Sequence, residues 1–163
     1  MRREILTLGA PILREKAKPV RKYDANLKKL IEDMIETMKS ANGLGLAAPQ
    51  IGISQRVIVV LQDDDSPLPL VNPQIVYAEG LDEGEEGCLS IPNLFGIVPR
   101  PWFVKVTGYN PKGKQVKVEA EGLLARALCH EIDHLDGILF IDKAYPNTLY
   151  WAEQGEAKET SAK

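Results

Sequence analysis

The chain has 163 residues, of which 44% are hydrophobic and 26% charged, a balance typical of a single soluble domain with a substantial core. Its formal net charge of -3 gives no basic surface of the kind that nucleic-acid binding requires. No apolar run is long enough to span a bilayer and no secretory leader pattern opens the chain. We therefore expect a cytoplasmic protein without direct nucleic-acid or membrane partners.

The first fifty residues contain one well-marked helix. Residues 4–8 predict a short strand, and two prolines make residues 10–20 an irregular surface arm. Asp24 is a good helix N-cap, and apolar side chains then recur every three or four positions until Asn42 and Gly43 end the pattern. We predict an amphipathic N-terminal helix whose apolar stripe faces the core. The apolar positions are Leu27, Leu30, Ile31, Met34, Ile35 and Met38.

Residues 43–52 read Gly-Leu-Gly-Leu-Ala-Ala-Pro-Gln-Ile-Gly, which is too rich in glycine for a helix and too apolar for an ordinary exposed loop. The stretch lacks the lysine and hydroxyl of a phosphate-binding loop and the spacing of a dinucleotide-binding motif. Glycine lets another chain approach the backbone closely. The stretch is therefore either a wall that lines a bound peptide or a tight packing turn.

Later segments have the patterns of β-strands. Residues 56–61 form a β-branched run typical of a buried strand, and residues 70–77 predict another strand with Pro73 near an edge. Residues 104–109 and 115–120 alternate around an Asn-Pro-Lys-Gly turn sequence. This pattern predicts an antiparallel hairpin.

A second helix, predicted over residues 123–135, carries the only two histidines of the chain, His130 and His134. At i, i+4 both imidazoles share one face and can reach one metal ion. Glu131 lies about 100° around the helix, where a carboxylate can contact a water at the metal without being a ligand. The sequence therefore predicts a catalytic metal site on this helix.

The rest of that helix is apolar on several sides, which indicates a central position in the fold. Projection places three further side chains on the histidine face, one and two turns nearer the N-terminus. These residues are Leu123, Arg126 and Ala127.

Two histidines leave a catalytic metal one protein ligand short. Cys88 is a good candidate, because a thiolate suits zinc or ferrous iron and three protein ligands leave a fourth position open. Glu85, Glu86 or Asp133 could instead supply an oxygen, so the residues alone leave the third ligand open. Cys129 points about 100° away from the ligand face and is interpreted as a core thiol.

Three stretches together resemble the motifs of peptide deformylases, in the family's order. They are residues 43–50, the run Glu86-Gly87-Cys88-Leu89-Ser90, and residues 130–134, and the resemblance extends to about Ala144. It implies an α+β fold in which antiparallel β-sheets pack around a central helix that carries H-E-x-x-H. It also implies one metallohydrolase domain over residues 1–144. The polar sequence after Ala144 predicts a partly disordered tail over residues 145–163.

The activity that the resemblance implies is hydrolysis of the N-formyl group of formyl-methionine on newly made polypeptides, with release of formate. Glu131 would be the general base and acid, while the Gln50 side-chain amide and the Leu89 N–H would stabilise the oxyanion. The implied metal ligands are Cys88, His130 and His134. The residues implied in substrate binding are Leu44, Gly45, Gly87, Leu123, Arg126 and Ala127. The implied metal is ferrous iron, for which zinc, nickel or cobalt can substitute.

The chain departs from the family pattern at a few places. Arg126 lies where other members often carry an aliphatic pocket residue, so we expect its stem to line the methionine slot with its charged head in water. Phe95 lies where many members have an arginine at the pocket rim. The tail lacks the basic helix that some members use on the ribosome, so we expect any ribosome contact to be transient and not to use a basic tail.

Two other functions compete with this interpretation. A zincin-like metallopeptidase shares H-E-x-x-H but completes its site downstream with histidine or glutamate, and no histidine follows His134. A metal-stabilised binding domain without activity would gain nothing from Glu131 beside the metal, and its fourth ligand position would be closed.

Overall fold

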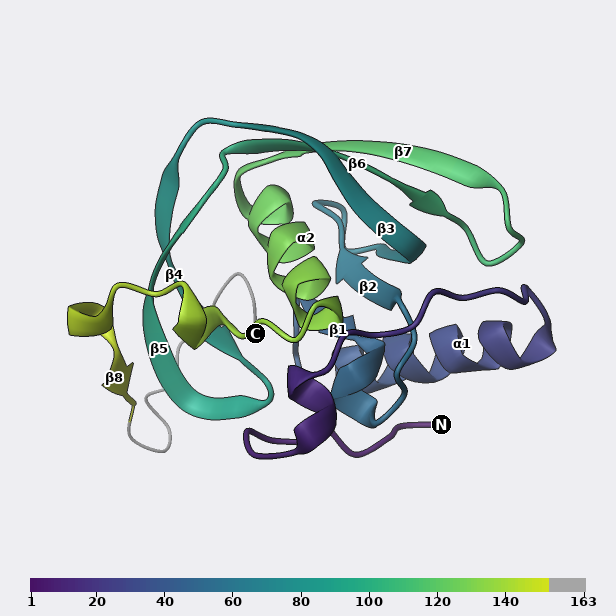
Figure 1. The fold of residues 1–163 in the computed structure, drawn as a ribbon, viewed down its shortest axis with the longest axis horizontal. Coiled ribbons are helices and arrows are strands. Elements are labelled where there is room, and N and C mark those ends of the chain that lie inside the picture. Colours follow the sequence, from purple (N-terminus) through teal and green to yellow (C-terminus); the bar gives the residue numbers. More distant parts are fainter. Residues whose placement is uncertain (153–163) are drawn as a thin grey trace.

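The computed structural model describes residues 1–152 and shows two antiparallel sheets around one central helix, with a second helix on the far side of the larger sheet (Figure 1). This arrangement confirms the predicted α+β class. In chain order the helices and strands are α1 (Ala25–Ser40), β1 (Gly45–Ala47), β2 (Val57–Leu61), β3 (Pro67–Glu79), β4 (Asp82–Cys88), β5 (Ile91–Arg100), β6 (Phe103–Tyr109), β7 (Gln115–Glu121), α2 (Gly122–Leu135) and β8 (Tyr150–Trp151).

The larger sheet has the strand order β1-β2-β3-β6-β7, and all its pairings are antiparallel. Strand β2 is buried on both faces, and its alternate residues point to opposite sides of the sheet. Val57 and Val59 belong to the apolar cluster formed with α1, whereas Ile58 and Val60 belong to the cluster formed with α2. The two helices therefore pack on opposite faces of this sheet.

Helix α1 confirms the predicted amphipathic helix. The Asp24 carboxylate accepts a hydrogen bond from the Leu27 N–H at 3.1 Å, a cap worth about 1 kcal/mol. Met34 and Met38 are fully buried, as expected for methionines that fill the core. The helix ends at Ser40, just before Asn42 adopts a positive φ of 56°.

The predicted strands of the larger sheet are also confirmed. Pro73 lies where β3 shifts register against β6, two residues after the pairing of β3 with β2 has ended at Val71. A proline is tolerated there because no ladder hydrogen bond needs its missing N–H. The hairpin β6–β7 turns through Asn110, whose side-chain oxygen accepts from the N–H groups of Lys112 and Lys114.

The smaller sheet, with the order β4-β5-β8, was not predicted from the sequence. Its long β4–β5 ribbon pairs Asp82 with Arg100 at one end and Cys88 with Ile91 at the other. The ribbon lies along one side of α2 and carries Cys88 to the helix (Figure 1). Strand β8 pairs with β5 through Tyr150, so the described part of the C-terminal tail, up to residue 152, is folded. The remainder of the predicted tail lies outside the described residues.

The prediction of a strand over residues 4–8 is wrong. Among the described residues this segment has no strand partner, because its N–H groups bond to two separate segments of the chain instead of one neighbouring strand. The Leu6 N–H donates to the Gln50 carbonyl at 2.7 Å, and the Leu8 N–H donates to the Ser90 carbonyl at 2.8 Å. Residues 10–20 are irregular apart from one 3-10 turn (Pro11–Arg14), but Leu13 is buried, so this arm is not confined to the surface.

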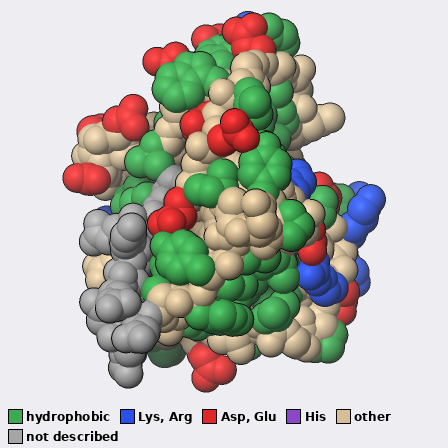
Figure 2. Space-filling view, turned by 90° about the vertical axis from the view of Figure 1, so that its left-hand side faces the viewer, with side chains coloured by type: hydrophobic (Ala, Val, Ile, Leu, Met, Phe, Trp, Pro, Cys, Tyr) green, Lys and Arg blue, Asp and Glu red, His purple; other side chains and the backbone are tan. Residues whose placement is uncertain are grey.

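Figure 2 shows the face of the molecule over the smaller sheet. Apolar side chains occupy much of this face, acidic side chains gather toward its upper part, and no histidine is visible. This agrees with the burial of both imidazoles, of which only 1–2% is exposed. No helix in the described part of the chain is both long enough and apolar enough to cross a bilayer.

Candidate metal centre

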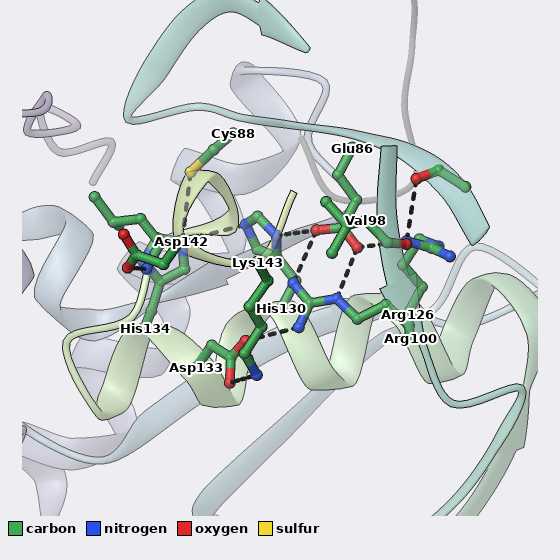
Figure 3. A network of polar contacts seen from close by, with 12 residues as sticks. Glu86, Cys88, Val98, Arg100, Arg126, His130, Asp133, His134, Asp142 and Lys143 are labelled. Carbon is green, nitrogen blue, oxygen red and sulfur yellow. Dashed lines mark hydrogen bonds and ion pairs between the residues drawn. The ribbon is translucent and has the colours of Figure 1, made fainter. Parts of the chain in front are cut away.

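The two histidines and Cys88 meet in the interior of the protein. His130 and His134 lie one turn apart on α2, with their Nε2 atoms 3.2 Å apart. The Cys88 sulfur, at the end of β4, lies 3.4 Å from the His134 Nε2. One ligand atom from each residue lies within 4.8 Å of the others, and all three residues are buried. Figure 3 shows the sulfur and both imidazoles turned toward a common point.

This donor set fits a metal ion. Tetrahedral bonds of about 2.0–2.1 Å to nitrogen and about 2.3 Å to sulfur would separate two nitrogens by about 3.3 Å and a sulfur from a nitrogen by about 3.6 Å. The distances here are close to these values. Burial raises the pKa of the Cys88 thiol to about 12, so a cation is needed to hold a thiolate there. Burial also lowers the pKa of His134, which keeps that imidazole neutral and able to bind a metal.

Glu86 holds one of these histidines in place. Its Oε1 lies 2.9 Å from the His130 Nδ1, and its two oxygens accept three further hydrogen bonds from the guanidinium groups of Arg100 and Arg126. Burial alone would raise the pKa of Glu86, but the bonds from Arg100 and His130 outweigh it and hold the pKa well below its usual range. An ionised Glu86 only accepts, so the His130 Nδ1 carries the proton and Nε2 faces the metal position.

The carboxylates that competed with Cys88 as third ligand have other partners. Glu86 is engaged as described, and Asp133 pairs with Arg100 at 2.6 Å and with Lys143 at 3.0 Å. The Tyr150 hydroxyl donates to Glu85 at 2.8 Å. The geometry therefore favours Cys88, which the sequence alone had left open. Cys129 is buried in the apolar cluster against the larger sheet, as predicted.

Glu131 is 1% exposed, and its Oε1 has no hydrogen-bond partner among the described residues. Burial, together with the negative charge of Glu86, raises the pKa of the Glu131 carboxyl well above its usual range. The carboxyl group lies against β1, where a Cβ built on Gly45 would stand 2.5 Å from its Oε2. A buried carboxyl oxygen without a partner is costly in free energy, which makes Glu131 a candidate functional group.

Gln50 lies on the 3-10 helix (Ala48–Ile51) that follows β1, with its side-chain nitrogen 3.6 Å from the Cys88 sulfur. Its Oε1 accepts from the Ala47 N–H at 2.9 Å and its Nε2 donates to the Ser90 hydroxyl at 3.1 Å. Leu89 and Ser90 form the turn between β4 and β5, next to Cys88. The hydrogen bond between Gln50 and Ser90 thus places this turn next to the Gln50 side chain.

The remaining predicted substrate residues lie on two backbone walls and in one small cavity. Gly45 belongs to β1, the edge strand of the larger sheet, and Gly87 belongs to β4, against the buried ring of Phe95. Phe95 therefore lies beneath the backbone rather than at a solvent-exposed rim. The cavity, of about 170 Å³, has mostly apolar walls. It is lined by Leu44, Leu61, Gln62, Asp63, Asp65, Leu123, Leu124 and Ala127.

The expectation that the charged head of Arg126 lies in water is wrong. Arg126 is 2% exposed and does not line the cavity. Its guanidinium donates to Glu86 at 2.6 Å and to the backbone carbonyls of Asp82 and Val98 (Figure 3). These hydrogen bonds replace the ones that water would supply to an exposed guanidinium. Arg126 therefore ties α2 to the β4–β5 ribbon.

Sequence reasoning missed two contributors to the site. Arg100 gave no local signal, because its role depends on the pairing of β5 with β4 across the ribbon. Ser90 lies in one of the motif stretches, but the sequence predicts no role for it, and only the fold brings its hydroxyl to Gln50. For Glu86 the sequence did hold a signal. Glu86 lies two residues before Cys88, and on a β-strand residues two apart point to the same side.

Comparison with known proteins agrees with this geometry. The family model of polypeptide deformylases matches residues 2–149. The peptide deformylase of Desulfitobacterium hafniense is 51% identical over 141 residues, which are 86% of this chain and 93% of that protein. That of Symbiobacterium thermophilum is 52% identical over 158 residues, which are 96% of this chain and 72% of that protein. The crystal structure of the Thermotoga maritima peptide deformylase matches with a TM-score of 0.86 and 46% identity, over 90% of this chain and 99% of that one. The chain therefore belongs to the polypeptide deformylase family, whose members are metal-dependent hydrolases that remove the N-formyl group from newly made polypeptides.

Proposed function

We propose that Glu131 is the general base and acid of a formamide hydrolysis carried out beside the Cys88–His130–His134 donor set. The observation that carries this proposal is the buried Glu131 carboxyl, which has an oxygen without a partner and adjoins a three-ligand site. A metal bound there would supply Lewis acidity and lower the pKa of water. Three protein ligands would leave a further ligand position of that metal open, as catalytic rather than structural metal sites do.

The chain's own residues then account for the steps of the reaction. Water attacks the formyl carbon while Glu131 accepts its proton. The carbonyl oxygen, now negatively charged, receives hydrogen bonds from the Gln50 side-chain amide and the Leu89 N–H, and each such donor typically contributes about 3 kcal/mol. The C–N bond breaks, Glu131 returns the proton to the departing amine, and the products are formate and a free amino terminus.

Substrate selection follows from the same surroundings. The edge strand β1 can accept the substrate backbone as an added strand, with Leu44 and Gly45 on one side and Gly87 on the other. The cavity beside Leu123 and Ala127 supplies apolar walls for the methionine thioether. Formyl is the smallest acyl group, and the Glu131 side chain packs directly against the backbone of Gly45, where no Cβ would fit.

We further propose ferrous iron as the physiological metal, with zinc, nickel or cobalt able to replace it. One thiolate and two imidazoles suit both ferrous iron and zinc. The substrates are formyl-methionyl chains as they are made, so we place the protein in the cytoplasm. Contact with the ribosome would be transient and would not use a basic tail.

The test is an anaerobic formate-release assay on the iron-loaded protein, with a formyl-methionyl peptide beside the acetyl-methionyl peptide of the same sequence. We expect release of formate from the first and no deacetylation of the second. Glu131→Ala should abolish turnover and keep about one metal ion per chain. Equal action on both peptides, or none on either, would contradict the proposed substrate. Loss of metal and fold in the variant would favour a structural role for Glu131.

A further inference from the structure

The N-terminal segment that failed to form a strand joins two loops of the metal centre. Residue 6 donates its N–H to the carbonyl of Gln50, and residue 8 donates its N–H to the carbonyl of Ser90, at 2.7 and 2.8 Å. These two loops lie 40 residues apart in the sequence. One carries the Gln50 side-chain amide, and the other carries the Leu89 N–H. Both bonds are made by the backbone, and Leu8 as a whole residue is 48% exposed.

A third hydrogen bond joins the same two loops directly. The Gln50 Nε2 donates to the hydroxyl of Ser90, whose residue is fully buried. The orientation of the Gln50 amide is fixed at its other end, since the Ala47 N–H can only donate and must therefore face the carbonyl oxygen. The NH2 group then points toward Ser90 and the Cys88 sulfur, which is the direction that an oxyanion donor needs.

We propose that residues 6–8 and the Ser90 hydroxyl form a brace that sets the position of the two oxyanion donors relative to each other. The brace consists of three hydrogen bonds: Leu6 N–H to Gln50, Leu8 N–H to Ser90, and Gln50 Nε2–H to the Ser90 hydroxyl. Its residues are positioning residues, because they act through Gln50 and Leu89. This inference rests on the oxyanion role given to those two groups under the proposed function.

A brace of this kind has a physical rationale. Donors to a developing oxyanion act only when they are held within about half an ångström of the productive position. Gln50 lies on the short 3-10 helix after β1, in the larger sheet, and Leu89 lies in the turn that ends the β4–β5 ribbon of the smaller sheet, so no shared element fixes the two donors relative to each other. Residues 4–8 do not form the expected strand because the N–H groups of Leu6 and Leu8 donate to Gln50 and Ser90 instead of to a neighbouring strand. Local rules of structure are commonly broken at functional sites in this way.

The experiment is a double-mutant cycle on the metal-loaded full chain. Ser90→Ala should lower kcat for the formyl-methionyl peptide about tenfold, with KM within about twofold and about one metal per chain. In the Gln50→Ala background the same change should lower kcat less than about twofold, because the amide that it positions is gone. Equal losses in both backgrounds, or no loss in the unmodified chain, would overturn the proposal.

The backbone bonds are tested by proline, which removes an N–H. Leu8→Pro should lower kcat about tenfold, whereas Glu4→Pro places the same ring at an exposed position of the same segment and should leave kcat within about twofold. If both prolines reduce kcat equally, the bond to Ser90 has no specific role. If Leu8→Pro fails to fold or to hold metal, the proposal is judged by the double-mutant cycle of Ser90→Ala and Gln50→Ala.

A measurement without turnover separates this inference from the proposed function. In the zinc-loaded protein, the Gln50 side-chain amide should give distinct, slowly exchanging proton resonances, and the Leu6 and Leu8 amides should be protected from hydrogen exchange. Ser90→Ala should shift the Gln50 amide resonances and speed their exchange. A protein that shows these signals but releases no formate would contradict the function alone. Fast exchange in the unmodified protein would overturn the brace.

Discussion

Replacing Glu86 by glutamine tests whether the site depends on a buried charge as well as on its ligands. Glu86 Oε1 accepts from the His130 Nδ1 and the Arg100 Nη2, both at 2.9 Å. Its Oε2 accepts from the Arg100 Nε at 2.8 Å and from the Arg126 Nη1 at 2.6 Å. Glutamine has nearly the same shape, but whichever way its amide turns, the NH2 group meets two donors. The buried guanidinium groups of Arg100 and Arg126 also lose the negatively charged partner that they share.

Two magnitudes follow from this arrangement. Breaking a buried ion pair by removing one partner typically costs about 3–5 kcal/mol, because the remaining charge stays buried. Loss of the group that orients a metal-bound histidine typically weakens metal binding about 10–100-fold, which corresponds to about 1.4–2.7 kcal/mol. We therefore expect Glu86→Gln to lower the free energy of unfolding by about 3–5 kcal/mol and the zinc affinity by about 10–100-fold.

The assays are urea unfolding of the metal-loaded chain and competition for zinc with a chelator of known affinity. Glu119→Gln is the matched control, since this glutamate is 66% exposed and its pairing with Lys105 spans 3.9 Å. It should change the free energy of unfolding by less than about 0.5 kcal/mol. A Glu86→Gln protein that matches this control in both assays would refute the role given to the buried carboxylate.

Other substitutions probe the proposed catalytic carboxyl, the proposed substrate cavity and the ion pairs of the buried Asp33. Gly45→Ala places a Cβ 2.5 Å from the Glu131 Oε2 and should displace that carboxyl. In a formate-release assay we expect kcat to fall about 100-fold while the metal is retained. A near-normal kcat would show that the reaction tolerates displacement of Glu131. Ala127→Phe puts a larger side chain into the cavity. It should lower kcat/KM about tenfold for a formyl-methionyl peptide and much less for a formyl-glycyl peptide. Equal losses of kcat/KM for the two peptides would show that the methionine side chain does not bind in this cavity. The pKa of Asp33 is lowered by hydrogen bonds from the Met1 amino group and then, against the effect of burial, from Arg3 and Lys29. Since its folded pKa lies below the unfolded value of about 3.9, its contribution is full above that pH and falls as the pH drops. The difference in unfolding free energy between the unmodified chain and Asp33→Asn should therefore shrink below about pH 4, and a constant difference would contradict this.

Much of the helical part of the fold is readable from the sequence because its signals are local. The spacing of the apolar side chains and Asp24 mark α1, and the i, i+4 histidines mark the face of α2 that carries the candidate metal ligands. The hairpin β6–β7 is likewise marked by alternation and by its turn residues. Each of these patterns lies within one or two consecutive elements, where short-range rules suffice.

The β4–β5 ribbon could not be predicted in the same way. Strand β4 reads Asp-Glu-Gly-Glu-Glu-Gly-Cys, which has no apolar alternation and resembles a solvated loop. Glu86 is nevertheless fully buried, because Arg100 and Arg126 reach it from other elements and satisfy its charge. The prediction that the charged head of Arg126 lies in water was wrong for the same reason, because its partners lie on distant elements of the chain. Charged residues of this kind are buried only when distant partners meet, and those partners are not visible in local patterns.

The central claim is that the Cys88 sulfur and the two imidazoles of α2 bind one metal ion. X-ray absorption at the zinc edge of the zinc-loaded protein tests it most directly. We predict one sulfur at about 2.3 Å and two imidazole nitrogens at about 2.0–2.1 Å, with the sulfur lost in Cys88→Ser. A spectrum without sulfur, or one that Cys88→Ser leaves unchanged, would contradict the account.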